Sequence, residues 1–284
     1  MPSEPVKYTN INGKLCPESE ASIAPDNRSF RYGYGLFETI LVEDNTLRLR
    51  ELHWQRLFAG MRQLSINIPQ LLTADFLENE VLKTVKKNKF EKCCRVRLQV
   101  YAGNGGLFDN RASKPGFVIE CYPLDPETVG LNENGLVLGF AQNLAKSKDM
   151  LSNLKSSNAL IYAIAAQQAM TNRWNDALLC NTDSFAIESS IANIFWVKEG
   201  LLYTPPLDSG CVAGVMRQYI IDSLNSKGIN VSIENISATG LLAAEELFLT
   251  NAIRRIKWVS TLNNKQLKHD LTKHVHNLLF VNRP

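Results

Sequence analysis

The segment at 93–103, CCRVRLQVYAG, constrains the fold more than any other short stretch of the sequence. Apolar and polar side chains alternate along it, with Val96, Leu98 and Val100 set against Arg95, Arg97 and Gln99. Because side chains of a strand point alternately to its two faces, this pattern predicts a strand that is buried on one face only. The rest of the chain supplies candidate partner strands and candidate helices.

Turn signals and periodicity predict those elements. A hairpin is expected around Asn12 and Gly13, two strands around a turn at 43–46, and another hairpin around Glu199 and Gly200. Further strand-like runs lie at 116–124, 136–142, 228–236 and 245–259. Helices are expected at 51–64, 73–88, 157–173 and 214–228. The expected N-caps are Thr73 or Asp75 for the second helix and Ser156, Ser157 or Asn158 for the third, and Gly228 is expected to end the fourth.

Strands and helices mix in both halves of the chain without a regular alternation of strand, helix and strand. This arrangement predicts an α+β fold with two lobes and a cleft between them. The segment PLDPETVGLNENG at 123–135 is rich in proline, glycine, asparagine and acidic residues, which is typical of a domain boundary. We therefore expect an N-terminal α+β domain at 1–124, a linker at 125–134 and a C-terminal α+β domain at 135–284.

Composition and charge exclude several classes of function. The chain has 284 residues, 45% of them hydrophobic and 21% charged, and its net charge of +3 is too small to indicate nucleic acid as a partner. No apolar run approaches the length of a membrane span, and the N-terminal residues do not resemble a signal peptide. The six cysteines and four histidines show no metal-ligand spacing. We expect a cytoplasmic enzyme with reduced thiols, no metal and no membrane partner.

Four short features carry possible chemistry. Lys155 lies in a polar loop before a helix, Glu188 ends an apolar run, and Gly214 leads directly into a helix. On the helix at 51–64, His53 and Arg56 share a face. Taken one at a time, each has an ordinary explanation as a solvated or loop residue. Together they match one cofactor, pyridoxal 5′-phosphate (PLP), with an amine for its aldehyde, a carboxylate for its ring nitrogen, and an arginine and a helix start for its phosphate.

The order and wording of these motifs resemble the class IV aminotransferases, fold type IV of the PLP enzymes. That family includes branched-chain aminotransferases, D-amino-acid aminotransferases and 4-amino-4-deoxychorismate lyases. The resemblance covers nearly the whole chain, and the segments that carry it are RYGYGLFETI, HWQRL, KSSNAL, ESSIANIFWV and YTPPLDSGCVAGVMRQ. The resemblance implies a two-domain fold, a PLP-binding C-terminal domain, an active site between the domains and a homodimer.

The resemblance also implies roles for individual residues. Lys155 would be the catalytic lysine that forms the Schiff base, and Glu188 would be the partner of the ring nitrogen. The phosphate would be held by Arg56, by the backbone of Val215 and Met216, and by the segment Asn251 and Ala252. A small amine or amino-acid substrate would form an external aldimine, and Lys155 would remove the proton from the carbon that bears the amine.

Departures from the family pattern bear on which member the chain resembles. Asn251 with Ala252, and the wording GVMRQ around Met216, are more like the lyases. The uncharged loop YAGNGGLF at 101–108 and the wording FET at 37–39 are more like the aminotransferases. The sequence slightly favours a 4-amino-4-deoxychorismate lyase, which releases pyruvate and forms 4-aminobenzoate. The alternatives are an amino-acid aminotransferase of branched-chain or D-amino-acid type and, more remotely, a binding protein that has lost catalysis.

Four further residues are candidates for the substrate pocket. They are Tyr32, Phe37, Tyr101 and Arg254. The aromatic residues would form its walls, and Arg254 could bind a substrate carboxylate. Ordinary aromatic packing and a solvated arginine would explain the same residues equally well.

Overall fold

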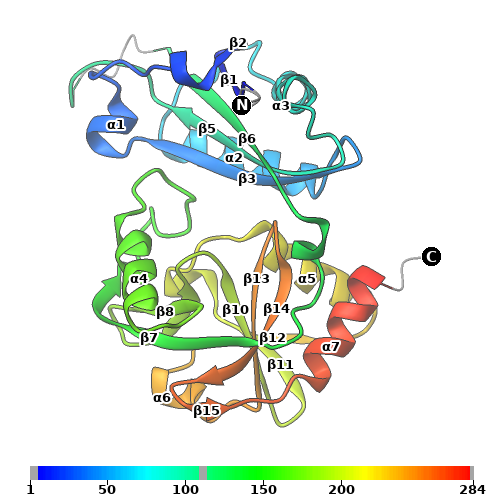
Figure 1. Ribbon diagram of the computed structural model, residues 1–284. Helices are drawn as coiled ribbons and strands as arrows, with labels where there is room; N and C mark the ends of the chain where they lie inside the picture. The colour runs from blue at the N-terminus through cyan, green and yellow to red at the C-terminus, as the bar shows by residue number, and fades with distance from the viewer. Residues whose placement is uncertain (1–5, 109–113, 282–284) are drawn as a thin grey trace. The chain divides into compact units, whose positions relative to one another are not determined.

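The computed structural model describes residues 6–108 and 114–281, and the chain forms two compact units (Figure 1). The first unit consists of Met1–Thr128 together with the short segment Lys155–Asn158, and the second of Val129–Leu154 and Ala159–Pro284. Both units contain helices and strands, which confirms the α+β expectation. The first five residues of the N-terminal segment, which does not resemble a signal peptide, lie outside the described residues.

An antiparallel sheet forms the centre of the first unit. Its strand order is β2-β1-β6-β5-β3-β4. The strands are β1 (Tyr8–Ile11), β2 (Lys14–Pro17), β3 (Gly35–Glu43), β4 (Thr46–Leu47), β5 (Cys93–Tyr101) and β6 (Gly116–Pro123). The alternation in β5 is confirmed, because Val96, Leu98 and Val100 are fully buried. Both expected turns are present, with positive φ at Asn12 and Gly13 and at Asp44 and Asn45.

Two helices cover the buried face of this sheet. They are α2 (Arg50–Gln63) and α3 (Ala74–Asn88), while α1 (Arg28–Tyr32) and two 3₁₀ turns at Glu18–Glu20 and Pro126–Val129 are short. The expected cap is confirmed at Thr73, whose hydroxyl accepts a hydrogen bond from the Phe76 amide. Leu57 and Met61 are buried on α2.

The second unit contains a sheet that closes into a barrel. Pairing runs through β10-β13-β14-β7-β8-β9, and β9 pairs again with β10. The ring strands are β7 (Leu136–Lys146), β8 (Asp176–Asn181), β9 (Ala186–Ser189), β10 (Asn193–Lys198), β13 (Glu246–Asn251) and β14 (Arg255–Leu262). Strands β11 (Leu201–Thr204) and β12 (Val231–Ile233) continue from β10, and β15 (Lys265–Gln266) pairs with β14.

The core of the second unit lies inside this ring. One buried cluster takes side chains from all six ring strands: Leu138, Phe140, Leu178, Ala186, Ile194, Trp196, Leu247, Leu249, Val259 and Leu262. The helices of the unit are α4 (Leu160–Thr171), α5 (Val215–Asn225), α6 (Ala238–Leu241) and α7 (Asp270–His276), with a 3₁₀ turn at Leu207–Ser209 and a π turn at Asn277–Val281. A filled barrel of this kind is a rigid support for the loops at its rim.

The expected cap of α4 is wrong. Ala159 occupies the N-cap position and no side chain caps the helix. Ser156, Ser157 and Asn158 instead belong to the first unit, where the backbone of Ser156 and Ser157 pairs with β3. Helix α5 also ends at Asn225, three residues before the expected glycine.

Within residues 6–108 and 114–281, no helix is both long and apolar enough to cross a membrane. The same residues contain no group of three or more His, Cys, Asp or Glu side chains that would hold a metal ion. All six cysteines are described, and each is a free thiol.

Candidate functional site

Lys155 is fixed by backbone pairing to an open edge of β3. The Phe37 amide donates to the Lys155 carbonyl and the Ser157 amide donates to the Gly35 carbonyl, each over 2.9 Å. Strand β4 pairs only with the far end of β3, so the short segment 155–157 adds to the edge that β4 leaves free. The Lys155 side chain therefore lies beside Phe37, with Nζ 4.4 Å from the centre of its ring.

Arg97 reaches the same aromatic ring from β5. Its guanidinium carbon lies 3.9 Å from the centre of the Phe37 ring, and Nη2 donates to Gln99 over 2.8 Å. Burial lowers the pKa of Arg97, with nearby Glu120 opposing that effect. Two cationic side chains, Lys155 and Arg97, thus share one aromatic surface. From the sequence, Arg97 was assigned only to the polar face of β5. Phe37 lies on the same face of the sheet, because side chains also alternate between the two faces along β3.

Arg56 is held in a buried polar group with Glu38 and His53. Its Nε and Nη2 donate to the two carboxylate oxygens of Glu38 over 2.8 and 2.5 Å, and His53 Nδ1 contacts Glu38 over 2.6 Å. Burial alone would raise the pKa of Glu38, but Arg56 and His53 together lower it to about 2. Burial also lowers the pKa of His53 against the opposing effect of Glu38. Glu38 orients the guanidinium that the sequence assigned to phosphate.

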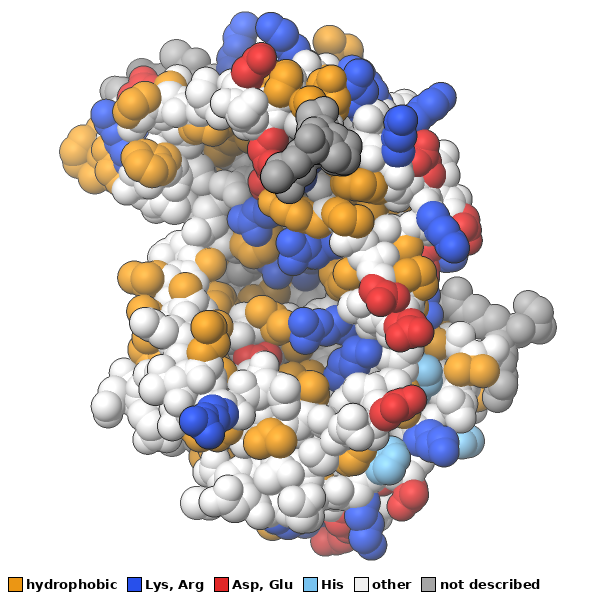
Figure 2. Space-filling view, in the orientation of Figure 1, with side chains coloured by type: hydrophobic (Ala, Val, Ile, Leu, Met, Phe, Trp, Pro, Cys, Tyr) orange, Lys and Arg blue, Asp and Glu red, His pale blue; other side chains and the backbone are white. Residues whose placement is uncertain are grey.

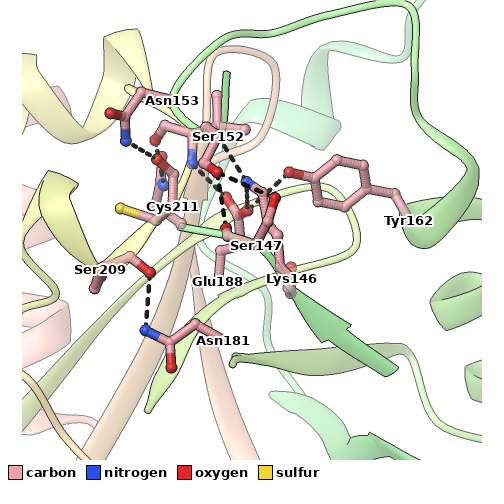
Figure 3. Close-up of polar contacts among 12 residues, drawn as sticks. Lys146, Ser147, Ser152, Asn153, Tyr162, Asn181, Glu188, Ser209 and Cys211 are labelled. Carbon is pink, nitrogen blue, oxygen red and sulfur yellow. Dashed lines mark hydrogen bonds and ion pairs between the residues drawn. The ribbon is translucent and has the colours of Figure 1, made fainter. Parts of the chain in front are cut away.

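Glu188 lies in β9 at the centre of a second polar group (Figure 3). Oxygen Oε1 accepts from Lys146 Nζ over 2.5 Å and from the Tyr162 hydroxyl over 2.8 Å. Oxygen Oε2 accepts from the Val212 amide over 2.9 Å. Burial, followed by the nearby Glu188, raises the pKa of Tyr162, so the phenol remains a donor. Lys146 and Tyr162 were not predicted from the sequence, because no periodicity connects them to Glu188.

The N-terminal end of α5 is buried and has no side-chain cap. Val215 and Met216 are each 4% exposed, and the first amides of a helix have no partner within the helix. Gly214 fits closely against Asn193, since a Cβ at this glycine would overlap Oδ1 of Asn193. The amide of Asn193 in turn donates to the Val212 carbonyl over 2.9 Å.

A buried hydroxyl lies close to this helix start. Thr250 is directly opposite Asn193 in the pairing of β13 with β10, so the two side chains share a face. Its Oγ1 is one of the buried polar atoms that have no hydrogen-bond partner among the described residues. Uncapped amides beside an unsatisfied hydroxyl form a site suited to an anion. Thr250 was not among the site residues predicted from the sequence.

The next residues along β13 form a tight turn. Oδ1 of Asn251 accepts from the amides of Ile253 and Arg254 over 3.1 and 2.8 Å, so this side chain stabilises its own loop. Ala252 is half-buried, and Arg254 is exposed.

The predicted aromatic walls occupy different surroundings. Phe37 is in contact with Lys155, whereas Tyr32 is 43% exposed on α1, where Figure 2 shows apolar side chains gathered. Tyr101 accepts a hydrogen bond from Asn12 and lines an open cavity of about 660 Å³ with Phe76 and Phe117. That cavity is lined by neither Lys155 nor Arg56.

The candidate residues thus form two groups, one in each unit. Lys155, Phe37 and the Arg56 pair belong to the first unit. Glu188, the start of α5 and the β13 turn belong to the second, where Val212 connects Glu188 to the helix start.

A family model for amino-transferase class IV matches residues 35–261. The chain belongs to the class IV aminotransferase family. It is 27% identical over 247 residues to an aminodeoxychorismate lyase of Vibrio harveyi, with 86% of this chain and 89% of the relative covered. It is 31% identical over 265 residues to a putative branched-chain-amino-acid aminotransferase of Methanocaldococcus jannaschii, with 90% of each covered. A branched-chain aminotransferase structure from Thermoproteus uzoniensis superposes with a TM-score of 0.85 at 25% identity, covering 96% of this chain and 93% of that one.

Class IV aminotransferases depend on PLP, and this chain is a PLP-dependent enzyme. Two features of its residues fit the cofactor, and neither feature is needed to form the fold. The start of α5 is buried, uncapped and beside an unsatisfied hydroxyl, which suits a phosphate. Glu188 is a buried carboxylate with a positive neighbour, which suits a ring nitrogen.

Proposed function

We propose that this enzyme is a 4-amino-4-deoxychorismate lyase, which releases pyruvate from its substrate and leaves 4-aminobenzoate. The observation that carries the proposal is the lyase-like wording of both phosphate segments. At Met216 and Ala252 the chain has no side-chain hydroxyl, where many of the aminotransferases carry a threonine, and the Asn251 side chain is already used within its own turn. The similarity to the Vibrio harveyi lyase supports the same choice.

The residues that would hold PLP come from both units. Arg56, oriented by Glu38, would bind the phosphate as a cation, and the amides of Val215 and Met216 would bind it at the helix start. Thr250 would donate its unsatisfied hydroxyl to the same phosphate. The backbone of Asn251 and Ala252 would complete this contact, and Glu188 would face the ring nitrogen.

PLP withdraws electrons from the carbon that bears the substrate amine when it is bound. Lys155 would take the proton from that carbon at Nζ, and its backbone pairing to β3 holds this amine in one place. In the lyase, the neighbouring bond from ring carbon to oxygen then breaks. The three-carbon fragment leaves as pyruvate after it gains a proton.

Arg97 is the best-placed group for a substrate carboxylate. It shares the Phe37 ring with Lys155, so a carboxylate bound by Arg97 would lie close to the reacting amine. The proposed lyase substrate carries two carboxylates. Arg254, which is exposed in the second unit, is a further candidate for such a contact.

A second candidate is an amino-acid aminotransferase of branched-chain type. The similarity to the Methanocaldococcus jannaschii relative and the uncharged loop at 101–108 favour it. In that case Lys155 would return the proton to the cofactor carbon instead of allowing a bond to oxygen to break.

One pair of assays separates the two candidates. The purified, PLP-loaded protein is given 4-amino-4-deoxychorismate, with 4-aminobenzoate followed by fluorescence and pyruvate by a coupled reductase. In parallel it is given L- and D-amino acids with 2-oxoglutarate. Equal amounts of pyruvate and 4-aminobenzoate support the lyase. Glutamate formation without 4-aminobenzoate would replace it with the aminotransferase.

The assignment of the reactive lysine has its own test. Borohydride reduction of the loaded protein followed by peptide mass analysis should place the cofactor on Lys155. Lys155→Ala should lose this label and at least a thousandfold of the rate, since the nucleophile and base are the same group. The matched variant Lys148→Ala removes an exposed lysine paired with Asp183, and it should keep both the label on Lys155 and the rate of the wild type. A label on Lys146 in the wild-type protein would overturn the assignment.

A further inference from the structure

The carboxylate of Glu188 retains room for one more hydrogen bond. An ionised carboxylate offers about four acceptor positions, two on each oxygen. Lys146 and Tyr162 occupy both positions on Oε1, while Val212 occupies one on Oε2 (Figure 3). Among the described residues these are the donors to Glu188, so the acceptor position that they leave is on Oε2, to which Lys146 makes no described contact.

Lys146 is itself held in a defined position. It is the last residue of β7, its side chain is 8% exposed, and Nζ also donates to the Ser152 carbonyl over 2.9 Å. A buried lysine needs such partners, because an unpaired buried charge is strongly unfavourable. Lys146 and Glu188 form an ion pair that belongs entirely to the second unit.

We propose that Lys146 is a positioning residue that acts through Glu188, directing Oε2 toward the cofactor ring and lowering the affinity of the ring nitrogen for its proton. The inference rests on the proposed function, in which Glu188 faces that nitrogen. Lys146 is not the lysine that binds the aldehyde. The ring nitrogen and the aldehyde carbon are at opposite ends of the ring, so a lysine in contact with Glu188 is at the wrong end.

The reason for the effect is electrostatic. A protonated ring nitrogen and the Lys146 ammonium would share one carboxylate, and like charges near a common partner raise each other's energy. Without Lys146, the full charge of Glu188 would be available to the ring. The enzyme would thus hold a weaker electron sink than a lone glutamate provides, which limits how strongly the substrate carbon is activated.

The other titratable groups around Glu188 do not replace this effect. Tyr162 on α4 is a neutral donor, because burial and Glu188 raise its pKa. Burial and Glu188 also raise the pKa of the Cys211 thiol to about 12, against the opposing effect of Arg217 and Lys146. Arg217 donates to the Pro205 carbonyl, away from the carboxylate. Among the described contacts of Glu188, Lys146 is the cation.

The test is a titration of the ring nitrogen in the loaded protein. PLP labelled with ¹⁵N at the ring is bound to the wild type, Lys146→Gln and Lys146→Arg, and the ¹⁵N shift is followed against pH. Lys146→Gln keeps a donor for Oε1 and removes the charge, so its midpoint should rise by roughly one pH unit, a tenfold gain in proton affinity. Lys146→Arg keeps the charge and should stay close to the wild type.

Lys148→Gln is the matched control, since it removes an exposed lysine two residues away. A midpoint that is equal in Lys146→Gln and the wild type would overturn the proposal, because a merely structural lysine would leave the ring unaffected. If Lys146→Gln does not fold, the double variant Lys146→Met/Glu188→Gln removes both charges. Its midpoint should equal that of Glu188→Gln alone if Lys146 acts through Glu188, whereas a midpoint above that of Glu188→Gln would show that the lysine charge acts on the ring directly and would contradict the proposal.

A second readout uses the protein without cofactor. Lys146→Gln should lower its thermal midpoint, since Glu188 is left buried without a cation, and adding Glu188→Gln should recover part of the loss. An unchanged midpoint would contradict the pairing. Failure of the proposed function is recognised separately: the wild type would then retain no PLP, or borohydride would label a residue other than Lys155.

Discussion

At the scale of single residues, the Phe37 ring organises the chemistry of the first unit. Lys155 and Arg97 both lie against it, one from the edge segment and one from β5. A substrate carboxylate bound by the Arg97 guanidinium would therefore lie close to the Lys155 amine. Arg97 therefore belongs to substrate binding in the proposed site.

The contribution of Arg97 can be measured with Arg97→Leu. Removing a charge-assisted hydrogen bond should raise KM for the productive substrate by about 10- to 100-fold, from a loss of about 1.5–3 kcal/mol, with a smaller change in kcat. Steady-state kinetics of the loaded enzyme provide the measurement. Arg95→Leu, on an exposed arginine of the same strand, should leave KM unchanged. Equal effects of the two variants would assign Arg97 to the fold and not to the substrate.

The residues that sequence reasoning identified are those embedded in recognisable motifs, such as Lys155, Glu188 and Arg56. Those it missed act through tertiary contacts. Lys146 is 42 residues from Glu188, and no local pattern relates them. Glu38 could have been predicted more easily. It occupies an inward position of β3 between Leu36 and Ile40, where a buried carboxylate needs a cation as a partner.

At the scale of elements, the contact of α2 with β3 depends on the Glu38 carboxylate. Its pKa in the folded protein is about 2, below the ordinary value of 4.5. A lowered carboxyl pKa stabilises the fold above the unfolded value, and this contribution is lost as pH falls through the folded value. Glu38→Gln should thus lower the free energy of unfolding at pH 7 by about 3 kcal/mol, with the difference from wild type shrinking between about pH 4.5 and about 2.

Urea unfolding of the protein without cofactor, repeated at several pH values, measures the loss in the free energy of unfolding at pH 7 and the pH range over which that loss shrinks. The control is Glu43→Gln at the end of the same strand, where the partner Arg48 is 41% exposed. That pair should contribute less than about 1 kcal/mol. A difference for Glu38→Gln that stays constant toward low pH would show that Glu38 is not the group whose protonation is linked to folding.

The start of α5 can be tested through Gly214. In Gly214→Ala the added Cβ overlaps Oδ1 of Asn193, so the helix start or Asn193 has to move. We expect the dissociation constant for PLP to rise by about 5- to 150-fold, because a loss of about 1–3 kcal/mol is typical of such overpacking. Cofactor titration followed by absorbance measures it.

Two companion variants locate the effect. Adding Asn193→Ala removes the overlapping atom and should recover part of the affinity. Gly228→Ala strains a positive φ of 75° beyond the other end of the same helix, where the added Cβ meets nothing within 4 Å. It should lower stability by about 1 kcal/mol and leave PLP affinity unchanged. If Gly228→Ala weakens PLP equally, the change at Gly214 reflects stability alone.

Element types were predictable where local chemistry decides them. Asn12 with Gly13, and Glu199 with Gly200, adopt the positive φ values that two-residue hairpin turns require. The cap of α4 was not predictable, because the polar residues before it are used in pairing with β3 instead. Closure of the barrel, in which β9 returns to β10, depends on a sheet geometry that no local pattern records.

At the scale of the whole molecule, the proposed cofactor residues are divided between two units. Lys155 and Arg56 belong to one, and Glu188, Val215 and Met216 to the other. A ligand that binds only when both are folded stabilises both by mass action. Calorimetry should therefore show a single unfolding transition with bound PLP, at a temperature several degrees above the first transition of the protein without cofactor.

The corresponding control is Lys155→Ala loaded with PLP, which keeps the other contacts and removes the covalent one. Its unfolding temperature should lie between those of the wild-type protein with PLP and the wild-type protein without it. If PLP raises the melting of only one unit, the proposed division of the phosphate and ring contacts is wrong.

The attachment of Lys155–Asn158 to β3 limits how the chain can tolerate insertions and deletions. Successive residues of a paired strand face opposite sides, so the direction of the Lys155 amine depends on whether an odd or an even number of residues separates it from the pairing point at Ser156. Extra residues before Leu154 or after Asn158 would lengthen a turn and leave that parity intact. One residue inserted between Lys155 and Ser156 would reverse it and turn the amine away from Phe37, although every motif residue would be preserved.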